Sequence, residues 1–228
     1  MHRRLVFASI VPLLLASAAA AQTGITVTPL FGYTVFSDYY NGAVTAAGSS
    51  DRATLRLSFK SQFELGATVR YDLGFSPWSV VGSASHGAGG GKAEICQIDS
   101  CSGEEGTGDV TVWQFSAGVG RRLNLATTPL TPVFRATLAG QLSRVTLHNA
   151  GENGENASSN NFGANAGLSA DLTLSPRVGV VLSLNDAIVK SNVGDIFRSL
   201  SGSESTQLNF DSHWMNAVRI AAGISFRF

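Results

Sequence analysis

A stretch of strict two-residue alternation limits the folds open to this chain more than any other feature. Between residues 55 and 73, nine of the ten odd positions are apolar and none of the nine even positions is. A β-strand points successive side chains to opposite faces, so this pattern predicts a strand with one apolar and one polar face. The segment is far longer than the usual strand of about five or six residues.

The same alternation recurs along the chain and is weakest at 78–87. Turn-forming residues such as Gly74, Pro77, Pro129 and Pro176 stand between several of the segments. We therefore expect an all-β protein with eight strands, at 25–36, 55–73, 78–87, 109–123, 131–147, 161–174, 178–189 and 208–228.

The expected connections alternate between long and short. A soluble sandwich gives no reason for this sorting, whereas a barrel between two compartments has tight turns at one mouth and long loops at the other. A β-structure can cross lipid only when it is closed, because lipid offers its backbone no hydrogen-bond partners. The long connections are 37–53, 88–108, 148–160 and 190–207, and the short ones are 74–77, 124–130 and 175–177.

Composition excludes several classes of protein. The 228 residues carry 16 basic and 16 acidic side chains, so the formal net charge of zero argues against a nucleic-acid partner. Charged residues make up 14% of the chain, below the roughly 25% of soluble domains. Beyond the N-terminus there is no run of about 18 apolar residues, which excludes a mature helical membrane protein.

The first 21 residues are typical of a secretory signal peptide. Arg3 and Arg4 precede an apolar stretch from Leu5 to Leu15, and three alanines before Gln22 supply a small-residue cleavage site. An uncleaved N-terminal membrane anchor is the alternative. We therefore expect a signal peptide at 1–21 and a single barrel domain at 22–228.

Two cysteines, Cys96 and Cys101, lie in a stretch rich in glycine and serine. In an exported chain such a pair most simply forms a disulfide that tightens a loop. A metal site would need further soft ligands nearby, and there are none.

The last strand ends in a glycine-x-x-aromatic-x-aromatic pattern formed by Gly223, Phe226 and the terminal Phe228. This pattern resembles the final-strand signal of bacterial outer-membrane barrels. Ala221 stands where that family prefers a polar residue, which is a minor departure. Together with the alternating strands, the pattern makes residues 22–228 resemble the small outer-membrane proteins of the OmpA, OmpX and OmpW type.

The resemblance implies an eight-stranded antiparallel up-and-down transmembrane β-barrel in the bacterial outer membrane. It also implies contact with outer-membrane lipid, recognition by the barrel-insertion machinery and a monomeric state. Both termini are then periplasmic, because eight is an even number of crossings. Aromatic girdles are expected at both interfaces, from Tyr71, Phe75, Trp78, Phe226 and Phe228 at the periplasmic end and from Phe31, Tyr33, Trp113 and Trp214 towards the outer end.

The polar faces of the strands should fill the interior, because an eight-stranded barrel is about wide enough for side chains alone. Buried charges are costly unless paired. A hairpin centred near residue 154 puts Arg135 beside Thr173 and one diagonal step from Asp171, which predicts an Arg135–Asp171 ion pair. The expected inward charged or titratable residues are Arg56, Lys60, Glu64, Arg70, Asp72, Arg135, Asp171, Asp211, His213 and Arg219.

The sequence favours no catalytic constellation. Outside the expected signal peptide the histidines are His86, His148 and His213. Asp211 and His213 share a face, but a nucleophile in reach would have to come from another strand. We therefore expect no enzyme activity, no cofactor and no metal, and we interpret His213 as a hydrogen-bonding residue at the barrel mouth.

The loops carry two candidate contact regions. Tyr39 and Tyr40 lie in the first loop, and residues 195–200 form a candidate helical turn capped by Asp195. Ile196, Phe197 and Leu200 would share its apolar face, which either plugs the outer mouth or contacts a partner. Local packing on the rim is the alternative for both regions.

These observations favour an integral outer-membrane barrel with a structural or surface-interaction role, whose loops meet an extracellular ligand or surface. A narrow pore for small solutes, with a continuous gap between inward side chains, is the first alternative. A lipid-modifying enzyme that uses His213 or His86 and a soluble periplasmic barrel are the others.

Overall fold

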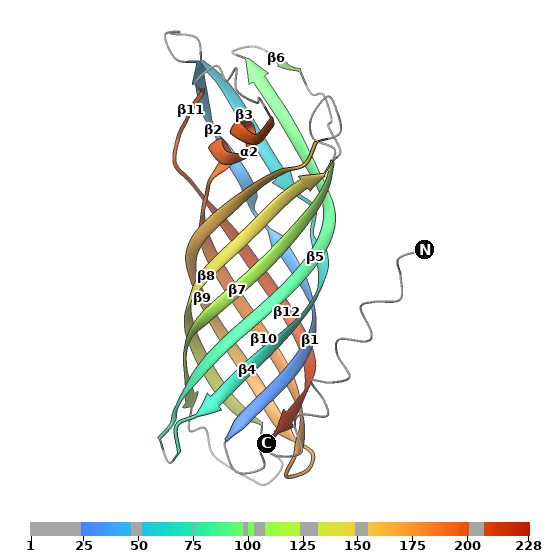
Figure 1. Ribbon diagram of the computed structural model, residues 1–228, viewed down its shortest axis with the longest axis vertical. Coiled ribbons are helices and arrows are strands. Elements are labelled where there is room, and N and C mark those ends of the chain that lie inside the picture. The colour runs from blue at the N-terminus through green and yellow to red at the C-terminus, as the bar shows by residue number, and fades with distance from the viewer. Residues whose placement is uncertain are drawn as a thin grey trace, which may run out of the picture.

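The computed structural model describes residues 24–46, 52–74, 76–97, 100–102, 108–123, 132–148, 155–200 and 208–228. It shows one tall β-barrel of tilted strands (Figure 1). The strands are β1 (Ile25–Phe36), β2 (Asp38–Ala46), β3 (Arg52–Phe59), β4 (Gln62–Asp72), β5 (Trp78–Gln97), β6 (Ser100–Ser102), β7 (Gly108–Leu123), β8 (Val133–His148), β9 (Ala157–Thr173), β10 (Val178–Ser191), β11 (Leu208–Phe210) and β12 (His213–Arg227). One helix, α2 (Val193–Leu200), lies between β10 and β11 and is not long and apolar enough to cross a membrane.

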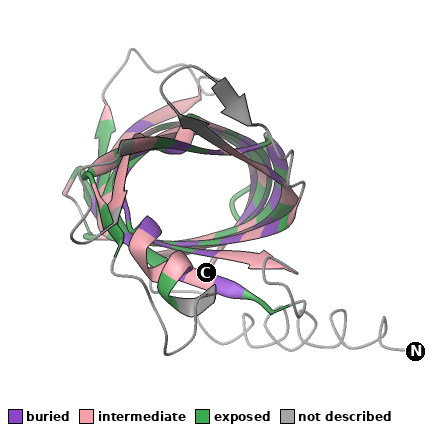
Figure 2. Cartoon of the chain, turned by 90° about the horizontal axis from the view of Figure 1, so that it is seen from above, coloured by how far each residue is buried: buried purple, intermediate pink, exposed green. Residues whose placement is uncertain are grey.

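The barrel closes as an eight-membered antiparallel ring, which confirms the expected fold. Its members pair in the order β1, β4, β5, β7, β8, β9, β10 and β12, and β12 pairs back with β1 through Leu30 and Gly223. Seen from above, the strands enclose one interior (Figure 2). The labels exceed eight because β2, β3 and β11 are continuations of barrel strands and β6 forms a short hairpin with β5.

The two ends of the barrel differ. At one end, the turn end, β1 begins beside the last residues of β12, with Thr26 opposite Arg227. Strands β4, β7 and β9 end there, and β5, β8 and β10 begin there (Figure 1). At the other end, the loop end, lie β2, β3, β6, α2 and β11.

Two of the long connections expected from the sequence are largely strand. Residues 38–46 form β2, and β5 continues to Gln97 through the glycine-rich run near residue 90. The glycines make room for a neighbouring side chain, because a Cβ at Gly87 or Gly89 would lie 2.7 or 3.0 Å from the Gln62 amide. The glycine-rich run, which was expected to be a loop, is therefore part of strand β5 and packs against the Gln62 side chain.

The ring has its apolar side outside. Many large apolar side chains are exposed on the outer wall, including Leu65 at 67%, Phe162 at 67% and Ile220 at 65%. Polar side chains such as Thr34 and Asp171 are buried inside the same wall. This distribution is the reverse of a soluble domain and matches a surface that meets lipid.

Towards the loop end this arrangement is inverted, so that apolar side chains point into the barrel and charged side chains point outward. Leu55, Leu57 and Phe59 of β3 are buried inside, while Arg56 and Lys60 are exposed. The expectation of one strand over 55–73 with Arg56 and Lys60 inside is therefore wrong. Arg56 instead forms a surface ion pair with Asp38, Nε to Oδ2 3.0 Å.

A one-residue bulge produces this reversal. Phe59 pairs with Gly91 and Glu64 with Gly87, so five steps along β3 and β4 face four steps along β5. One extra residue turns the following side chains to the opposite face. The apolar face of this strand therefore lies outside below the bulge and inside above it.

Candidate functional site

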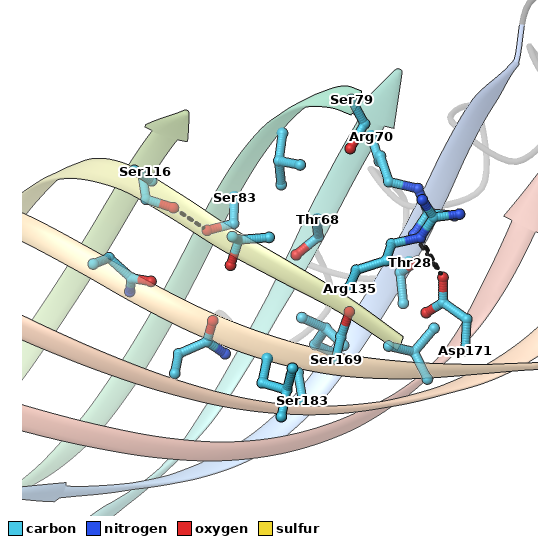
Figure 3. A pocket seen from close by; sticks show the side chains of 18 of the residues that line it. Thr28, Thr68, Arg70, Ser79, Ser83, Ser116, Arg135, Ser169, Asp171 and Ser183 are labelled. Carbon is cyan, nitrogen blue, oxygen red and sulfur yellow. Dashed lines mark hydrogen bonds and ion pairs between the residues drawn. The ribbon is translucent and has the colours of Figure 1, made fainter. Parts of the chain in front are cut away.

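The interior at the turn end holds a cluster of two arginines and two carboxylates, here called the arginine cluster. Arg70 Nη1 lies 2.8 Å and Arg135 Nε 3.1 Å from the same Asp171 oxygen, and both guanidinium groups lie 3.4 Å from Asp72 Oδ1. The four side chains come from β4, β8 and β9. Figure 3 shows Arg70, Arg135 and Asp171 pointing towards one another inside the barrel. Period-two alternation puts them on inward faces, and the ring brings the strands together.

The structure thus contains the Arg135–Asp171 ion pair, but with a different register. Arg135 lies opposite Ser169 and not Thr173, and Asp171 lies opposite Val133. Asp171 is still one diagonal step from Arg135, on the other side, within reach of a long side chain. The sequence placed Arg70 and Asp72 on inward faces without predicting that they complete the cluster.

A second polar network lies nearer the loop end and is centred on Glu64, which is 2% exposed. Its carboxylate accepts hydrogen bonds from Ser85 Oγ and Gln114 Nε2, both at 3.0 Å, and Arg219 Nη1 lies 3.7 Å away. Gln141 donates to Gln114 and so extends the network to β8. Charges buried in this way are stabilised by partners on other strands.

Between the two networks lies a cavity of about 70 Å³. Its wall carries hydroxyl groups, among them Thr28, Ser83 and Ser116, with the arginine cluster at one end (Figure 3). Ser83 and Ser116 are joined by a hydrogen bond of 2.6 Å. A cavity of this size holds a few water molecules, each of which takes about 30 Å³ in the liquid.

Above the polar networks, the interior is filled by a group of apolar side chains, here called the apolar cluster. It includes Tyr39 and Tyr40 of β2, which are fully buried. This group was not expected from the sequence, although Val110 and Val112 show that the inward face of β7 becomes apolar near its start. The other buried members are Leu55, Leu57, Phe59, Val145, Ala157, Val189, Val193, Ile196 and Met215.

Tyr39 and Tyr40 are therefore not surface contacts, and that expectation is wrong. The Tyr39 hydroxyl lies 2.6 Å from Ser159 Oγ and donates to Asn161 Oδ1 at 3.0 Å. Burial raises the pKa of Tyr39 to about 12. Tyr40 donates to the Ala43 carbonyl, so both hydroxyls serve the packing of the loop end.

Helix α2 covers the apolar cluster at the loop end. It begins at Val193, earlier than expected, so Asp195 lies in its first turn and accepts a hydrogen bond from the Asn192 side chain. Ile196 is 1% exposed, and the ring of Phe197 packs 5.2 Å from that of Phe210. Ile196 and Phe197 thus face the barrel, as the plug interpretation requires, while the side chain of Leu200 lies outside the described residues.

The remaining sequence candidates fall in different places. β5 and β6 pair Cys96 directly opposite Cys101, but their side chains lie outside the described residues, so the disulfide stays a prediction. Gly223 packs against β1, where a Cβ would overlap the Pro29 carbonyl oxygen. Phe226 and Phe228 are half-buried in the last turn-end residues.

The histidines form no catalytic group in the described part of the chain. His86 stacks on Trp113 with ring centroids 4.4 Å apart, and His148 bonds Thr111. His213 lies 3.2 Å from the Asp38 carbonyl, while Asp211 is exposed and not inside as expected. Among the described residues, no group of three or more histidine, cysteine or carboxylate side chains is placed to hold a metal ion.

Exposed aromatic side chains lie at both ends of the lipid-facing wall. Tyr71 and Trp78 are exposed at the turn end, where the Arg121 guanidinium lies 5.4 Å from the Trp78 ring. Trp113 and Trp214 are exposed nearer the loop end. Phe31 and Tyr33 are also exposed, and Phe75 lies outside the described residues.

Comparison with known proteins shows the fold. No protein-family model matches the chain, and no curated protein sequence matches it significantly. The outer membrane protein OprG from Pseudomonas aeruginosa is similar in structure, with TM-score 0.57, 11% identity and coverage of 90% of this chain and 95% of that one. Neisserial surface protein A gives TM-score 0.52 and 9% identity, covering 90% and 98%. The chain has the eight-stranded fold of small outer-membrane barrels.

Proposed function

We propose that this chain is an integral protein of a bacterial outer membrane that serves as a closed scaffold, presents its loop end at the cell surface and is not an enzyme. One observation carries the proposal. The described interior is filled by the two polar networks and the apolar cluster, which leave a cavity of about 70 Å³ between the networks. A filled interior of this kind suits a scaffold that supports and positions the two ends of the barrel. It does not suit a channel that conducts ions or solutes.

The outer wall supports the membrane location. Each of the eight ring strands carries large exposed apolar side chains, and exposed aromatic residues lie towards both ends of this wall. The turn end, with both ends of the described chain, would face the periplasm, and the loop end would face outward. The proposed partners of the protein are outer-membrane lipid, the barrel-insertion machinery and an extracellular ligand or surface at the loop end. The insertion machinery would recognise Gly223, Phe226 and Phe228.

The apolar cluster makes an ion pathway unfavourable. The interior at this level is packed with apolar side chains that include Val112, Val145 and Met215, each at most 1% exposed. The polar atoms beside them, such as the Tyr39 and Ser159 hydroxyls, are bonded to one another. Removing a charge from water without partners costs many kcal/mol. The narrow-pore alternative therefore requires the cluster to move aside.

Two measurements test the proposal together. The protein purified in detergent is run unheated and heated on an SDS gel, and a mobility shift on heating identifies a closed barrel. The same sample is then placed in planar bilayers, beside a porin of known conductance. We expect the shift and no stepwise conductance. Steady conductance from shifted protein would establish the pore alternative, and unshifted protein in the soluble fraction would refute a membrane barrel.

A variant of α2 separates plugging from partner binding. Phe197→Ser removes the ring that packs on Phe210, whereas Arg198→Ser changes a neighbouring side chain that is 75% exposed. We expect Phe197→Ser to lower the urea midpoint of the heat-modifiable form and Arg198→Ser to leave it unchanged. Equal midpoints for both variants would show that α2 does not seal the barrel and would favour a contact role.

The absence of enzyme activity is tested on lipid. His213→Ala and His86→Ala remove the two histidines that the enzyme alternative needs. We expect cells that express either variant to have the same lipid A and phospholipid composition as cells that express the unchanged protein. A variant-specific change would favour the lipid-modifying enzyme.

A further inference from the structure

The lipid-facing wall contains a groove between β7, β8 and β9, three strands that lie side by side (Figure 1). Its volume is about 420 Å³, and its lining is mainly apolar. Phe115, Leu142 and Phe162 lie in direct register across the three strands and form its wall towards the loop end.

The hollow arises from a row of small residues. Ala117, Gly140 and Ala164 follow in register, one row nearer the turn end. Large residues return in the next row with Leu138, which is 62% exposed. A large–small–large sequence of rows on a wall that meets lipid leaves a depression suited to an acyl chain.

Two cations lie at the loop-end side of this groove. Arg144 is exposed, follows Leu142 on the same face of β8 and lies opposite Trp113 and Asn160. Lys190 is exposed on β10 and lies opposite both Phe162 and Trp214. The two residues are separated by one strand and are offset by two residues along it, because Arg144 lies opposite Asn160 and Lys190 opposite Phe162. Their backbones are therefore roughly 12 Å apart at a strand spacing of about 5 Å.

No carboxylate neutralises these cations in the described part of the chain. Neither Arg144 nor Lys190 forms an ion pair with a carboxylate of the described residues. The nearest exposed or half-buried carboxylates on the neighbouring described strands are Asp211, three residues from Trp214, and Asp109 and Asp186, four residues from Trp113 and from Lys190. Three or four residues of strand span roughly 10–13 Å, beyond ion-pair distance.

We propose that this groove, with Arg144 and Lys190, binds a diphosphorylated, acylated lipid of the lipid A class. An acyl chain lies in the groove over Gly140, and the two cations each meet a phosphate group. The aromatic girdle supports placing the two phosphates beside these cations, because Trp113 and Trp214 flank Arg144 and Lys190 and girdle residues lie at the level of the lipid head groups. Lipid A is the assigned source because the two separated cations match two phosphates. The inference rests on the proposed outer-membrane location, in which the loop end lies in the outer leaflet.

Native mass spectrometry of the detergent-solubilised full chain tests the proposal, with diphosphoryl lipid A, monophosphoryl lipid A and phosphatidylglycerol added separately. We expect diphosphoryl lipid A to be retained most strongly. Arg144→Gln and Lys190→Gln should each weaken its binding by about fivefold, as expected for one cation at a lipid surface. Arg121→Gln is the matched control, because it removes an exposed cation beside Trp78 at the opposite end.

A groove-filling variant tests the acyl-chain contact separately. A Cβ at Gly140 would have the Ala117 carbonyl oxygen at 3.9 Å as its nearest contact, so Gly140→Leu fills the hollow without displacing the barrel. Ala222→Leu is its control, because Ala222 is exposed on the outer wall of β12, opposite Phe31 and Leu182 and away from the groove. We expect Gly140→Leu to weaken retention of diphosphoryl lipid A and Ala222→Leu to leave it unchanged.

The heat-induced gel shift of each variant reports the barrel independently of lipid. Equal retention of the three lipids, or equal effects of Arg144→Gln and Arg121→Gln, in shifted protein would overturn the lipid site and leave the barrel intact. Retention of phosphatidylglycerol as strong as that of diphosphoryl lipid A would overturn the lipid A assignment. Protein without a gel shift would instead refute the proposed membrane barrel.

Discussion

Replacing Asp171 by asparagine removes the carboxylate that Arg70 and Arg135 share. The Asp171 side chain is 1% exposed, and those of the two arginines are 10% and 8% exposed. After the change, Asp72 is the remaining carboxylate of the cluster, at 3.4 Å from each guanidinium. The cluster then carries one uncompensated positive charge inside the barrel.

The expected loss of stability follows from this burial. Removing one partner of a buried ion pair costs about 3–5 kcal/mol, because the other charge is left without compensation. Asparagine keeps the shape and one acceptor oxygen of aspartate, so we expect a loss of about 3 kcal/mol. A second change, Arg135→Gln, restores neutrality, and the double variant should be more stable than Asp171→Asn alone.

The assay is a urea titration in detergent, with the heat-modifiable gel form as the measure of folded protein. Asp38→Asn is the control, because it breaks the Arg56 pair, whose side chains are 53% and 25% exposed. An exposed pair contributes at most about 1 kcal/mol. The reasoning is refuted if Asp171→Asn loses no more stability than Asp38→Asn, or if adding Arg135→Gln makes the loss larger.

Three further predictions concern other parts of the barrel. The pKa of Tyr39 is raised by burial from 10.0 to about 12, so its contribution to stability is complete below pH 10 and is lost as the pH rises towards 12. A shift of this size corresponds to about 3 kcal/mol, and Tyr39→Phe should abolish this part of the alkaline loss in a pH series of urea midpoints. Gly223→Val should prevent closure of β12 on β1, at a cost of about 3 kcal/mol or more, and reduce the heat-shifted fraction, whereas Gly82→Val should not. Cys96 and Cys101 should react with a thiol-alkylating reagent only after reduction, as mass spectrometry would show; alkylation of unreduced folded protein would exclude the disulfide.

Much of the barrel could be predicted because period two decides which face a residue occupies. It put Arg135 and Asp171 inside without any knowledge of the turn between β8 and β9. The register was harder, because it depends on how many residues the turn uses, and Arg135 lies opposite Ser169 where the sequence suggested Thr173. The ion pair forms despite the different register, since an arginine side chain reaches a diagonal neighbour on either side.

The reversal near Lys60 was hidden for a different reason. Leu57 and Leu65 are both apolar and both odd, yet Leu57 is 6% exposed and lies inside, whereas Leu65 is 67% exposed and faces outward. The bulge turns the face at the same height at which the surroundings of the wall change from lipid to water. Two changes that coincide leave the sequence pattern unbroken, so no periodicity count detects them. Tyr39 and Tyr40 were misplaced because 37–53 was expected to be a loop, whereas residues 38–46 form β2 and both tyrosines pack in the apolar cluster.

The exchange of faces at the bulge also determines how deep the barrel sits in its bilayer. A tube with one uniform outer surface can slide along the membrane normal at little cost. This wall is different, because pushing it inward would carry the exposed Arg56 and Lys60 into hydrocarbon, and pulling it outward would expose Phe63 and Leu65 to water. Both displacements cost free energy. The single extra residue near Lys60 therefore fixes the position of the barrel along the membrane normal and holds the loop end at a constant height above the lipid.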